Sequence, residues 1–468
     1  MSDTHPALKA AFGHARAFLD SLPSRSVAPV DGLDVLRQKM TRPLPERTLA
    51  APTVIDELVA DASGGIMGSQ AGRFFSWVIG GSLPSAIAAD WMVSAWDQNA
   101  GVFATSPAAA VAEEVAGSWL KALFGLPAEA GFAFVTGAQM AHVTCLASAR
   151  HGLLARRGWD VGAQGLWKAP RLRVLASPDR HITVDRALRL LGHGTACIEI
   201  LPVDDSGRVT PEGLTSALAA SPDAAIVVLQ AGELNSGGFD PFERLAPIAR
   251  EAGAWVHVDG AFGLWARVSP AHTHLASGIE LCDSWVTDGH KYLNVPFDSG
   301  FAFVRDPSTQ VAAMSIATSY LPAGAAARSP IDWNPEFSRR ARGFAVYAAI
   351  RELGREGIAA LVERTCSHAR ELVSGLGMLP RTDVLALPVL NQGLVRFRSG
   401  KPGATAADDD AYTDDVIRRV NASGEAFFGG VTWNGRRAMR ISVCNWRTTA
   451  DDISRTLRAV RHALDANE

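Results

Sequence analysis

The sequence lacks the features that mark several large classes of protein. It has no run of about 20 apolar residues, the length that a membrane-spanning helix needs, so we expect no membrane span. The first twenty residues include an acid, Asp3, and no apolar core flanked by lysines, which argues against a secretory signal peptide. There is no strongly basic block and the formal net charge is −3. Nucleic-acid binding is therefore not expected to be the main role.

Cysteines are few and widely spaced. The chain has five, with no CxxC motif: Cys145, Cys197, Cys282, Cys366 and Cys444. An odd number in this spacing argues against both a disulfide framework and a zinc knuckle. We therefore expect reduced thiols in a cytoplasmic protein.

Hydrophobic residues make up 47% of the 468 residues and charged residues 20%, which is enough apolar material for a large core.

Short apolar runs alternate with helical patterns through the middle of the chain. There are seven of these runs, at 132–135, 173–177, 197–203, 225–230, 254–259, 284–287 and 301–306. Almost unbroken hydrophobic strands separated by helices are typical of an α/β fold with a mainly parallel sheet covered by helices on both faces. Only a short loop joins the last two runs, so that pair can also be antiparallel.

Helical patterns lie between most of these runs. Segment 106–125 predicts a helix with Ser106 as its N-cap and Pro107 at its first position. Its apolar residues recur at four-residue steps and indicate one apolar face, made of Val111, Val115, Trp119 and Leu123.

Composition divides the chain into three parts. The first sixty or so residues are rich in proline and arginine, and we interpret residues 1–70 as an arm of short helices. Residues 71–335 carry the seven runs and form the expected large α/β domain. After a long helical stretch, strands at 393–399 and 438–443 indicate a smaller C-terminal α+β domain at 336–468.

Polar residues follow the predicted strands at the points where they end. In an open α/β sheet, ligands bind beyond the carboxyl ends of the strands. Residues from five separate strand ends are therefore expected to meet in one crevice: Thr136, Asp179, His181, Asn235, Asp259, His290 and Lys291.

A lysine and an aspartate on neighbouring parallel strands suit pyridoxal 5′-phosphate. Lys291 would form a Schiff base with the cofactor aldehyde. Asp259 would pair with the pyridine nitrogen and keep it protonated. The turn at Gly137 opens a helix whose free backbone N–H groups suit a phosphate, and His181 is placed to stack on the ring.

Each of these residues has a plainer interpretation when it is considered alone. Lys291 can be a lysine whose amine reaches water, Asp259 a turn residue, and His181 a hydrogen-bonded structural histidine. Three other histidines, His257, His272 and His274, suggest metal ligands, but no consistent cluster of acids and histidines surrounds them. We therefore expect no metal, and the joint pattern favours the cofactor.

Four segments together resemble a known family. HVDGAFG, DSWVTDGHKYLNVPFDSG, SPDRHITVDRAL and AMRISVCNWRTTADDI are similar to motifs of the group II pyridoxal-phosphate-dependent decarboxylases. That family includes the aromatic-L-amino-acid, glutamate, histidine and diaminobutyrate decarboxylases. The likeness runs from about residue 70 to 455.

The resemblance implies a fold and a set of roles. The fold is type I of the pyridoxal-phosphate enzymes, the aspartate-aminotransferase type, in homodimers with the active site at the subunit interface. Segments 74–91 and 103–109 match the part of the family that lines the substrate site. The residues implied to bind the cofactor are the catalytic Lys291, Asp259 and His181, with His290 and the turn residues Gly137, Ala138 and Gln139 near the phosphate, and Ala261 beneath the ring.

Three departures from the family stand out. A GTT run is replaced by AGELNSGGFDP, which leaves Asn235 as the nearest polar candidate for the ring hydroxyl. Asp288 stands where the family often has asparagine, and we expect this carboxylate to turn away from the phosphate. The loop tyrosine that protonates the substrate carbon after CO2 leaves should lie within 320–340, but an ungapped count places Pro330 there, and Tyr320 is the segment's one tyrosine.

The resemblance thus implies a cytoplasmic, homodimeric carboxy-lyase that decarboxylates an L-amino acid. Another reaction of the same cofactor remains open, namely carbon–carbon lysis, aldehyde formation or transamination, as does a cofactor-binding protein without catalysis. Aromatic residues of the substrate segments hint at an apolar or aromatic substrate, although such residues are often core: Phe74, Phe75, Trp77 and Phe103.

Overall fold

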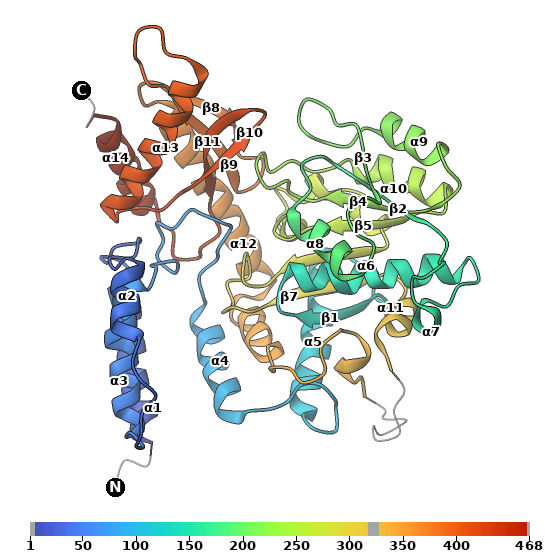
Figure 1. Cartoon of the computed structure of the whole chain (residues 1–468), viewed down its shortest axis with the longest axis horizontal. Coiled ribbons are helices and arrows are strands. Elements are labelled where there is room, and N and C mark those ends of the chain that lie inside the picture. Colours follow the sequence, from blue (N-terminus) through green and yellow to red (C-terminus); the bar gives the residue numbers. More distant parts are fainter. Residues whose placement is uncertain (1–4, 317–326, 466–468) are drawn as a thin grey trace.

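The computed structural model describes residues 5–316 and 327–465, which form two sheets (Figure 1). The larger sheet has seven strands in the order β1-β7-β6-β5-β4-β2-β3. These strands are β1 (Gly131–Val135), β2 (Leu172–Ala176), β3 (Ile198–Ile200), β4 (Ala224–Gln230), β5 (Trp255–Asp259), β6 (Ser284–Asp288) and β7 (Gly300–Val304). The smaller sheet contains β8 (Thr382–Ala386), β9 (Gln392–Phe397), β10 (Gly429–Trp433) and β11 (Arg436–Ser442).

The prediction of a mainly parallel seven-stranded sheet is confirmed. Neighbouring strands from β3 to β6 pair in parallel, whereas β7 pairs antiparallel with both β6 and β1. The short loop between β6 and β7 explains this reversal, because a parallel connection needs a crossover of a dozen or more residues.

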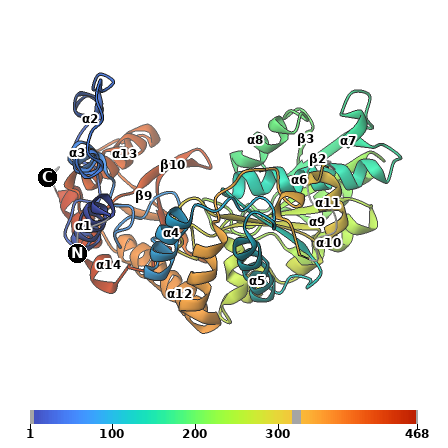
Figure 2. The same ribbon diagram turned by 90° about the horizontal axis from the view of Figure 1, so that it is seen from below.

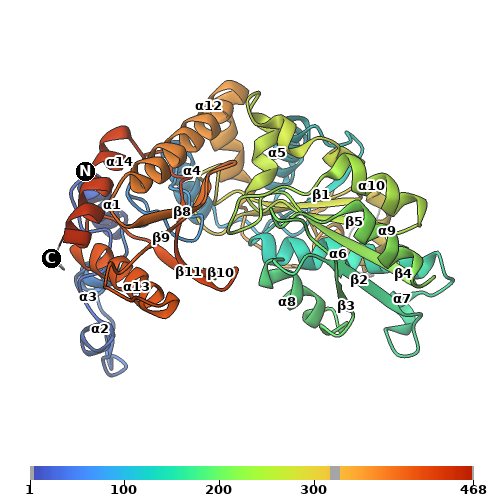
Figure 3. The same cartoon turned by 90° about the horizontal axis from the view of Figure 1, so that it is seen from above.

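Helices cover both faces of the large sheet. On β1, Ala133 and Val135 face the core that contains α6, whereas Phe132 and Phe134 face the opposite core, as the two-residue period of a strand requires. Figure 3 shows α6 and α8 below the sheet and α5 and α10 above it. The helices of this region are α5 (Pro107–Phe124), α6 (Ala138–Ala155), α7 (Val161–Gln164), α8 (Ile182–Leu190), α9 (Pro211–Ala219), α10 (Phe242–Glu251) and α11 (Pro307–Met314).

The start of α5 matches the sequence prediction, and the predicted face is buried only in part, since Leu123 and Trp119 pack on the core but Val111 does not. The helix begins at Pro107, and the Ser106 hydroxyl makes no capping hydrogen bond. Val111 is 47% exposed, whereas Ala116 and Leu120 are fully buried. Small residues let the helix lie close to its neighbours, so here packing and not the largest apolar stripe decides the buried face.

One long helix connects the two sheets. Figure 2 shows α4 (Pro84–Trp96) and α12 (Gly343–Gly377) between the large sheet at one end and the small sheet and N-terminal helices at the other. α12 breaks at Gly354, whose φ of 60° favours glycine. The remaining helices are α1 (Pro6–Ser21), α2 (Leu33–Met40), α3 (Ala51–Ala62), α13 (Ala406–Ser423) and α14 (Ala450–Asp465). None of the helices in the described ranges is long and apolar enough to cross a bilayer.

A buried ion pair ties the chain after residue 327 to the large sheet. Arg339 Nη1 lies 2.6 Å from Glu113 Oε1 on α5, and the same guanidinium donates to the carbonyls of Ala100 and Phe134. Both side chains of the pair are at most 1% exposed. Removing Glu113 would leave the buried guanidinium with the longer, 3.8 Å contact to Glu336 Oε2 as its remaining ion pair within the described residues.

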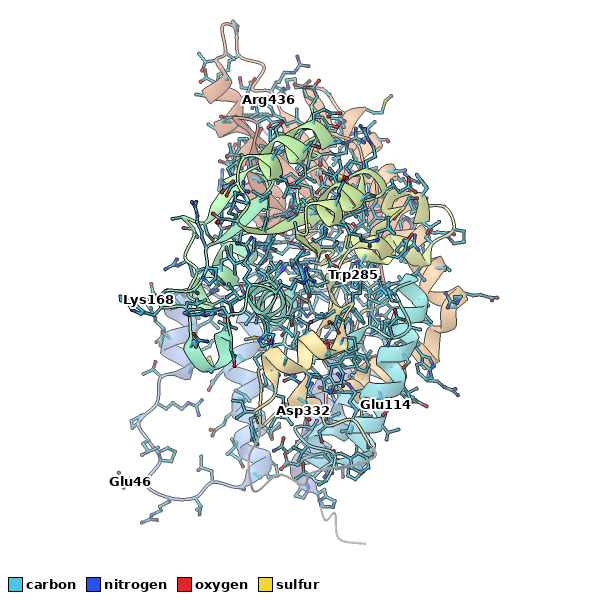
Figure 4. All side chains as sticks on the ribbon, turned by 90° about the vertical axis from the view of Figure 1, so that its right-hand side faces the viewer. Glu46, Glu114, Lys168, Trp285, Asp332 and Arg436 are labelled. Atoms are coloured by element: carbon cyan, nitrogen blue, oxygen red, sulfur yellow. The ribbon has the colours of Figure 1, made fainter. Side chains whose placement is uncertain are left out.

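We expect Glu113→Gln to lower the free energy of unfolding by about 3 kcal/mol, the cost of breaking a buried pair. The control is Glu114→Gln, which removes the same charge from the exposed neighbour labelled in Figure 4 and should change stability by about 0.5 kcal/mol or less. Chemical denaturation followed by tryptophan fluorescence measures both. Equal midpoints for the two variants would contradict the assigned role of the pair.

Candidate active site

The carboxyl ends of β4, β5 and β6 open onto a cavity of about 430 Å³. This volume lies within the range of small-molecule sites. Of the nine residues predicted to bind the cofactor, all but Asn235 line it. The lining residues are Trp77, Val78, Gly137, Ala138, Gln139, His181, Thr183, Gln230, Gly232, Leu234, Asp259, Ala261, Phe262, Asp288, His290, Lys291 and Arg440.

Lys291 follows β6 and places its amine in this cavity. Its side chain is 17% exposed, and Nζ lies 3.1 Å from Asp288 Oδ2. The amine also lies 5.9 Å from the centre of the Phe262 ring. Lys291 is therefore held between a carboxylate and an aromatic face instead of extending into bulk water.

Asp259 ends β5 and is 7% exposed. Its Oδ1 accepts a hydrogen bond from the Ala261 N–H at 3.1 Å, and its Oδ2 lies 3.5 Å from His142 Nε2. Burial raises the pKa of this carboxyl, but His142, His181 and Lys291 together lower it well below its ordinary value. Asp259 is thus an ionised carboxylate facing the cavity at neutral pH.

His181 enters the cavity as the N-cap residue of α8. Its Nδ1 lies 2.7 Å from Thr183 Oγ1 and accepts from the Thr183 N–H at 3.4 Å. Burial lowers the pKa of His181 below its ordinary value, so the imidazole is neutral at pH 7. Because Nδ1 accepts, the single ring proton is on Nε2.

The turn before α6 forms a second end of the cavity. A Cβ at Gly137 would lie 3.2 Å from His290 Cε1, so glycine allows the backbone to come close to His290. His290 Nδ1 accepts from the Ser299 N–H at 3.2 Å, and burial lowers the pKa of this imidazole. Its Nε2–H is therefore available as a donor, next to the N-terminus of α6, where anions are favoured.

Asp288 does not turn away from this end, contrary to our expectation. Its Oδ1 accepts a hydrogen bond from the Ala138 N–H at 2.7 Å and lies 3.6 Å from His290 Nε2. The side chain is almost fully buried. The helix N-terminus, His290 and Lys291 offset the cost of burying this charge, which explains why the carboxylate faces inward.

The structure does not bring Asn235 into the cavity. Its Nδ2 donates to Glu233 Oε1 at 2.7 Å, and its own N–H donates to the other oxygen of that carboxylate. Asn235 was predicted as the nearest polar candidate for the ring hydroxyl in the segment that replaces the GTT run. Gln230, the last residue of β4, lines the cavity in its place and pairs with Asp259 in the sheet.

Arg440 is a cavity residue that sequence reasoning missed. It lies on β11 of the small sheet and is 9% exposed. Within the described residues, its guanidinium makes no hydrogen bond and no ion pair to a protein group, and burial lowers its pKa. The signal in the sequence was an arginine between buried Met439 and Ile441, since a charge inside an apolar strand is unexpected without a partner.

Aromatic residues of the segment 74–91 divide between core and cavity. Phe74 and Phe75 are buried in the core, and neither they nor Phe103 line the cavity. Trp77 and Val78 do line it, and both have positive φ values, of 55° and 57°. This conformation is strained for bulky residues, and such strain is typical of functional sites.

The expected loop acid falls partly outside the described residues. Tyr320 lies in the segment 317–326, outside the described ranges. Pro330 is buried in the short helix η5 (Pro330–Asp332). The three tyrosines within the described ranges, Tyr292, Tyr347 and Tyr412, do not line the cavity. The described residues also contain no group of three or more side chains arranged to hold a metal ion.

These residues fit pyridoxal 5′-phosphate in charge, placement and volume. A lysine amine, an ionised aspartate and a neutral histidine share one cavity. The cavity also has an anion-favouring end at the glycine turn of α6. That donor set matches a cofactor with an aldehyde, a pyridine nitrogen and a phosphate.

Comparison with known proteins agrees with this fit. Residues 36–399 match the family model described as the pyridoxal-dependent decarboxylase conserved domain. A 4-hydroxyphenylacetaldehyde synthase of Rhodiola rosea is 27% identical over 342 residues, 70% of this chain and 68% of that protein. An aromatic-L-amino-acid decarboxylase of Bacillus atrophaeus is 23% identical over 453 residues, 95% and 92% of the two chains.

Solved structures share the fold. The crystal structure of Oryza sativa TDC with PLP and tryptamine superposes with a TM-score of 0.92 at 24% identity, covering 100% of this chain and 98% of that one. The crystal structure of the Rhodiola rosea synthase gives a TM-score of 0.87 at 21% identity, covering 98% and 97%.

We expect Lys291→Ala to abolish the long-wavelength absorbance of the cofactor bound to the purified protein, because no amine remains to bond to its aldehyde. Lys401→Ala, which removes an exposed lysine, should leave the spectrum unchanged. Absorbance spectra recorded after reconstitution with pyridoxal phosphate and removal of the free cofactor make the measurement. A wild-type spectrum in the Lys291 variant would exclude Lys291 as the attachment point.

Proposed function

The chain belongs to the pyridoxal-dependent decarboxylase family, and we propose that it removes the α-carboxylate of an apolar or aromatic L-amino acid at the cavity of Lys291. It is a pyridoxal-phosphate-dependent enzyme of the carboxy-lyase class. The observation that carries the assignment of the site is the meeting of the Lys291 amine and the ionised Asp259 on one buried cavity.

The roles of the chain's own groups follow from their positions. The bound cofactor supplies an electron sink for the pair of electrons left when CO2 departs. Asp259 would hold the proton on the pyridine nitrogen, and Lys291 Nζ would provide the covalent attachment. His181 would cover one face of the ring, with its own proton on Nε2. The groups that would hold the phosphate are His290 and the backbone at Gly137 and Gln139, since Asp288 takes the Ala138 N–H.

Arg440 is the group that suits the substrate carboxylate. Its guanidinium lines the same cavity as His181, without a protein carboxylate in contact within the described residues. A guanidinium binds a carboxylate with two parallel hydrogen bonds. Arg440 would therefore orient the substrate before the carbon–carbon bond breaks.

The substrate side chain would meet mostly apolar groups. Trp77, Val78, Leu234 and Phe262 line the cavity. The anions that line it, Asp259 and Asp288, are paired with the histidines and the lysine described above. This lining favours an apolar or aromatic substrate side chain over a charged one.

Aldehyde formation is a second candidate. The described tyrosines lie outside the cavity, so no tyrosine hydroxyl of the described lining can protonate the substrate carbon. One relative is named as an aldehyde synthase. In that reaction the amino acid, O2 and water give the aldehyde, CO2, ammonia and H2O2, with O2 as the oxidant.

A homodimer with the active site at its interface is the proposed assembly. α1 and α3 lie side by side away from the large sheet (Figure 1). They expose Leu8, Phe12 and Leu58, and α4 exposes Trp91 and Met92, each by more than 40%. An apolar cavity of about 680 Å³ lies between these helices. Exposed apolar surface of this kind supports a partner that covers it, and a second copy of this chain is the partner that needs the fewest assumptions.

The five free cysteines support a reducing, cytoplasmic location.

We expect the loaded enzyme to release one CO2 for each amine formed from an apolar or aromatic L-amino acid. Trapped CO2, amine, aldehyde and H2O2 are measured together across a panel of L-amino acids. Equal aldehyde and H2O2 in place of amine would establish the second candidate. A keto acid without CO2 would contradict both.

The same assay tests Arg440. Arg440→Met should raise KM about 10- to 100-fold, because the charged hydrogen bonds to the carboxylate contribute about 1.5–3 kcal/mol. Arg436→Met is the control, since Arg436 lies on the same strand but is exposed at its outer end (Figure 4). An unchanged KM in the Arg440 variant would remove it from substrate binding.

Light scattering should give twice the 49.6 kDa mass of one chain. The double variant Phe12→Asp, Leu58→Asp should dissociate, since it places two charges in the proposed interface. Met378→Asp alters a residue that is 86% exposed elsewhere on the surface and should leave the mass unchanged. A wild-type mass of a single chain would refute the dimer.

A further inference from the structure

Behind Asp259 lies a continuous row of buried polar side chains that does not line the cavity. His142 Nδ1 lies 2.9 Å from His257 Nε2, and His257 Nδ1 lies 2.8 Å from Ser284 Oγ. Trp255 Nε1 donates to the same Ser284 Oγ at 2.9 Å. These four side chains are at most 3% exposed. We define Trp255, Ser284, His257 and His142 as the buried row.

Regular secondary structure produces this row. His257 and Asp259 are two residues apart on β5 and therefore project from the same face, and Ser284 of β6 is the sheet partner of His257. That face is covered by α6. His142 lies four residues after Ala138 on α6, so it projects one turn beyond the helix N-terminus on the same side. The N-terminal end of α6, at Ala138, therefore lines the cavity. One turn later, His142 of the same helix contacts Asp259.

The direction of the hydrogen bonds follows from the two ends of the row. An ionised carboxylate only accepts, so His142 must carry its proton on Nε2, towards Asp259. With that proton on Nε2, His142 Nδ1 is the acceptor for His257 Nε2–H. Burial and His142 lower the pKa of His257 well below its ordinary value, so its Nδ1 is an acceptor for the Ser284 hydroxyl. Trp255 can only donate, which agrees with this direction at the far end.

His142 Nε2 makes no hydrogen bond within the described residues. Its 3.5 Å separation from Asp259 Oδ2 is the one contact with an acid that it makes there. A buried N–H left without an acceptor is costly, and Asp259 is the acid placed to accept from it. Because every member of the row donates towards Asp259, each bond polarises the next in the same sense.

We propose that His142 is a positioning residue that, supported by His257, Ser284 and Trp255, holds the Asp259 carboxylate ionised and oriented towards the pyridine nitrogen of the cofactor. This proposal rests on the proposed function. Its consequence is that the shared proton stays on the ring nitrogen, where it strengthens the electron sink, and does not move to the carboxyl of Asp259.

Two amide substitutions separate this role from a merely structural one. In His142→Gln the amide nitrogen reaches the position of Nε2, so it can still donate to Asp259. In His142→Asn the shorter amide reaches only the position of Nδ1 and loses Asp259. His142→Leu removes both contacts at similar volume. His272→Leu is the control, because His272 is also buried and contacts Ser269 and Arg370, away from the cavity.

The main readout is the ¹⁵N resonance of the ring nitrogen of labelled pyridoxal phosphate bound to each holoenzyme. We expect the wild type, His142→Gln and His272→Leu to show a protonated nitrogen. In His142→Asn and His142→Leu the resonance should move towards the unprotonated position. In these two variants kcat should fall about 10- to 100-fold with little change in KM, the effect of losing one hydrogen bond to a charged group.

A protonated ring nitrogen in both the Asn and Leu variants would overturn the proposal. If His142→Leu fails to fold, the comparison of the Gln and Asn variants decides alone. Failure of the proposed function has a different signature, because a wild-type protein that binds no cofactor, or binds it with an unprotonated ring, refutes the role of Lys291 or Asp259 before His142 is considered.

Discussion

The negative charge on Asp259 is the constraint on which the other features of the site depend. A carboxylate that is 7% exposed would take up a proton unless positive or donating groups face it. Here those groups come from four directions: the Ala261 N–H, His142 on α6, His181 at the start of α8, and Lys291 after β6. Each belongs to a different segment, so the carboxylate keeps its charge only when the large sheet and its helices are assembled. The ionisation of one side chain therefore depends on the tertiary fold as a whole.

Helix α6 contributes to two ends of the cavity, and this explains the unusual position of Asp288. The Ala138 N–H at its start binds the Asp288 carboxylate, and His142 one turn later contacts Asp259. Two carboxylates are thus held by one helix, at its N-terminus and on its sheet-facing side. Lys291 lies 3.1 Å from Asp288, so the amine has a counter-ion within the protein. A shift of α6 relative to β5 and β6 would disturb both carboxylates together, which couples the two ends of the site mechanically.

The sequence predicted those parts of the molecule that depend on local pattern. Six of the seven apolar runs became strands that are buried along their whole length, whereas β3 is only partly buried. Parallel strands end at one edge of a sheet, so His181, Asp259, His290 and Lys291 meet at one cavity. Thr136, Asp179 and Asn235, which were predicted to join them, do not line it. Contacts between distant segments were not predictable in this way. Asn235 was selected by its position after β4, but Glu233 binds its amide, and Gln230 faces the cavity. Arg440 comes from the other sheet, and His142 sits on a helix face whose partner, His257, is 115 residues away. The spacing of apolar and polar residues within a helix or a strand does not specify which distant side chain will contact it.

The choice between amine and aldehyde as product depends on how a proton reaches the substrate carbon. Within the described part of the cavity, the groups that carry a transferable proton are the Lys291 amine, His181 Nε2 and His290 Nε2. His290 lies at the glycine-turn end, next to Asp288, which leaves Lys291 and His181 for the substrate. Burial lowers the pKa of His181, so at neutral pH its Nε2–H is a hydrogen-bond donor and a weak acid. The Lys291 amine lies inside the cavity, 3.1 Å from Asp288 Oδ2, so it would remain close to a bound cofactor. In the proposed reaction Lys291 would therefore be the proton donor that this geometry favours, and its amine would compete with O2 for the substrate carbon.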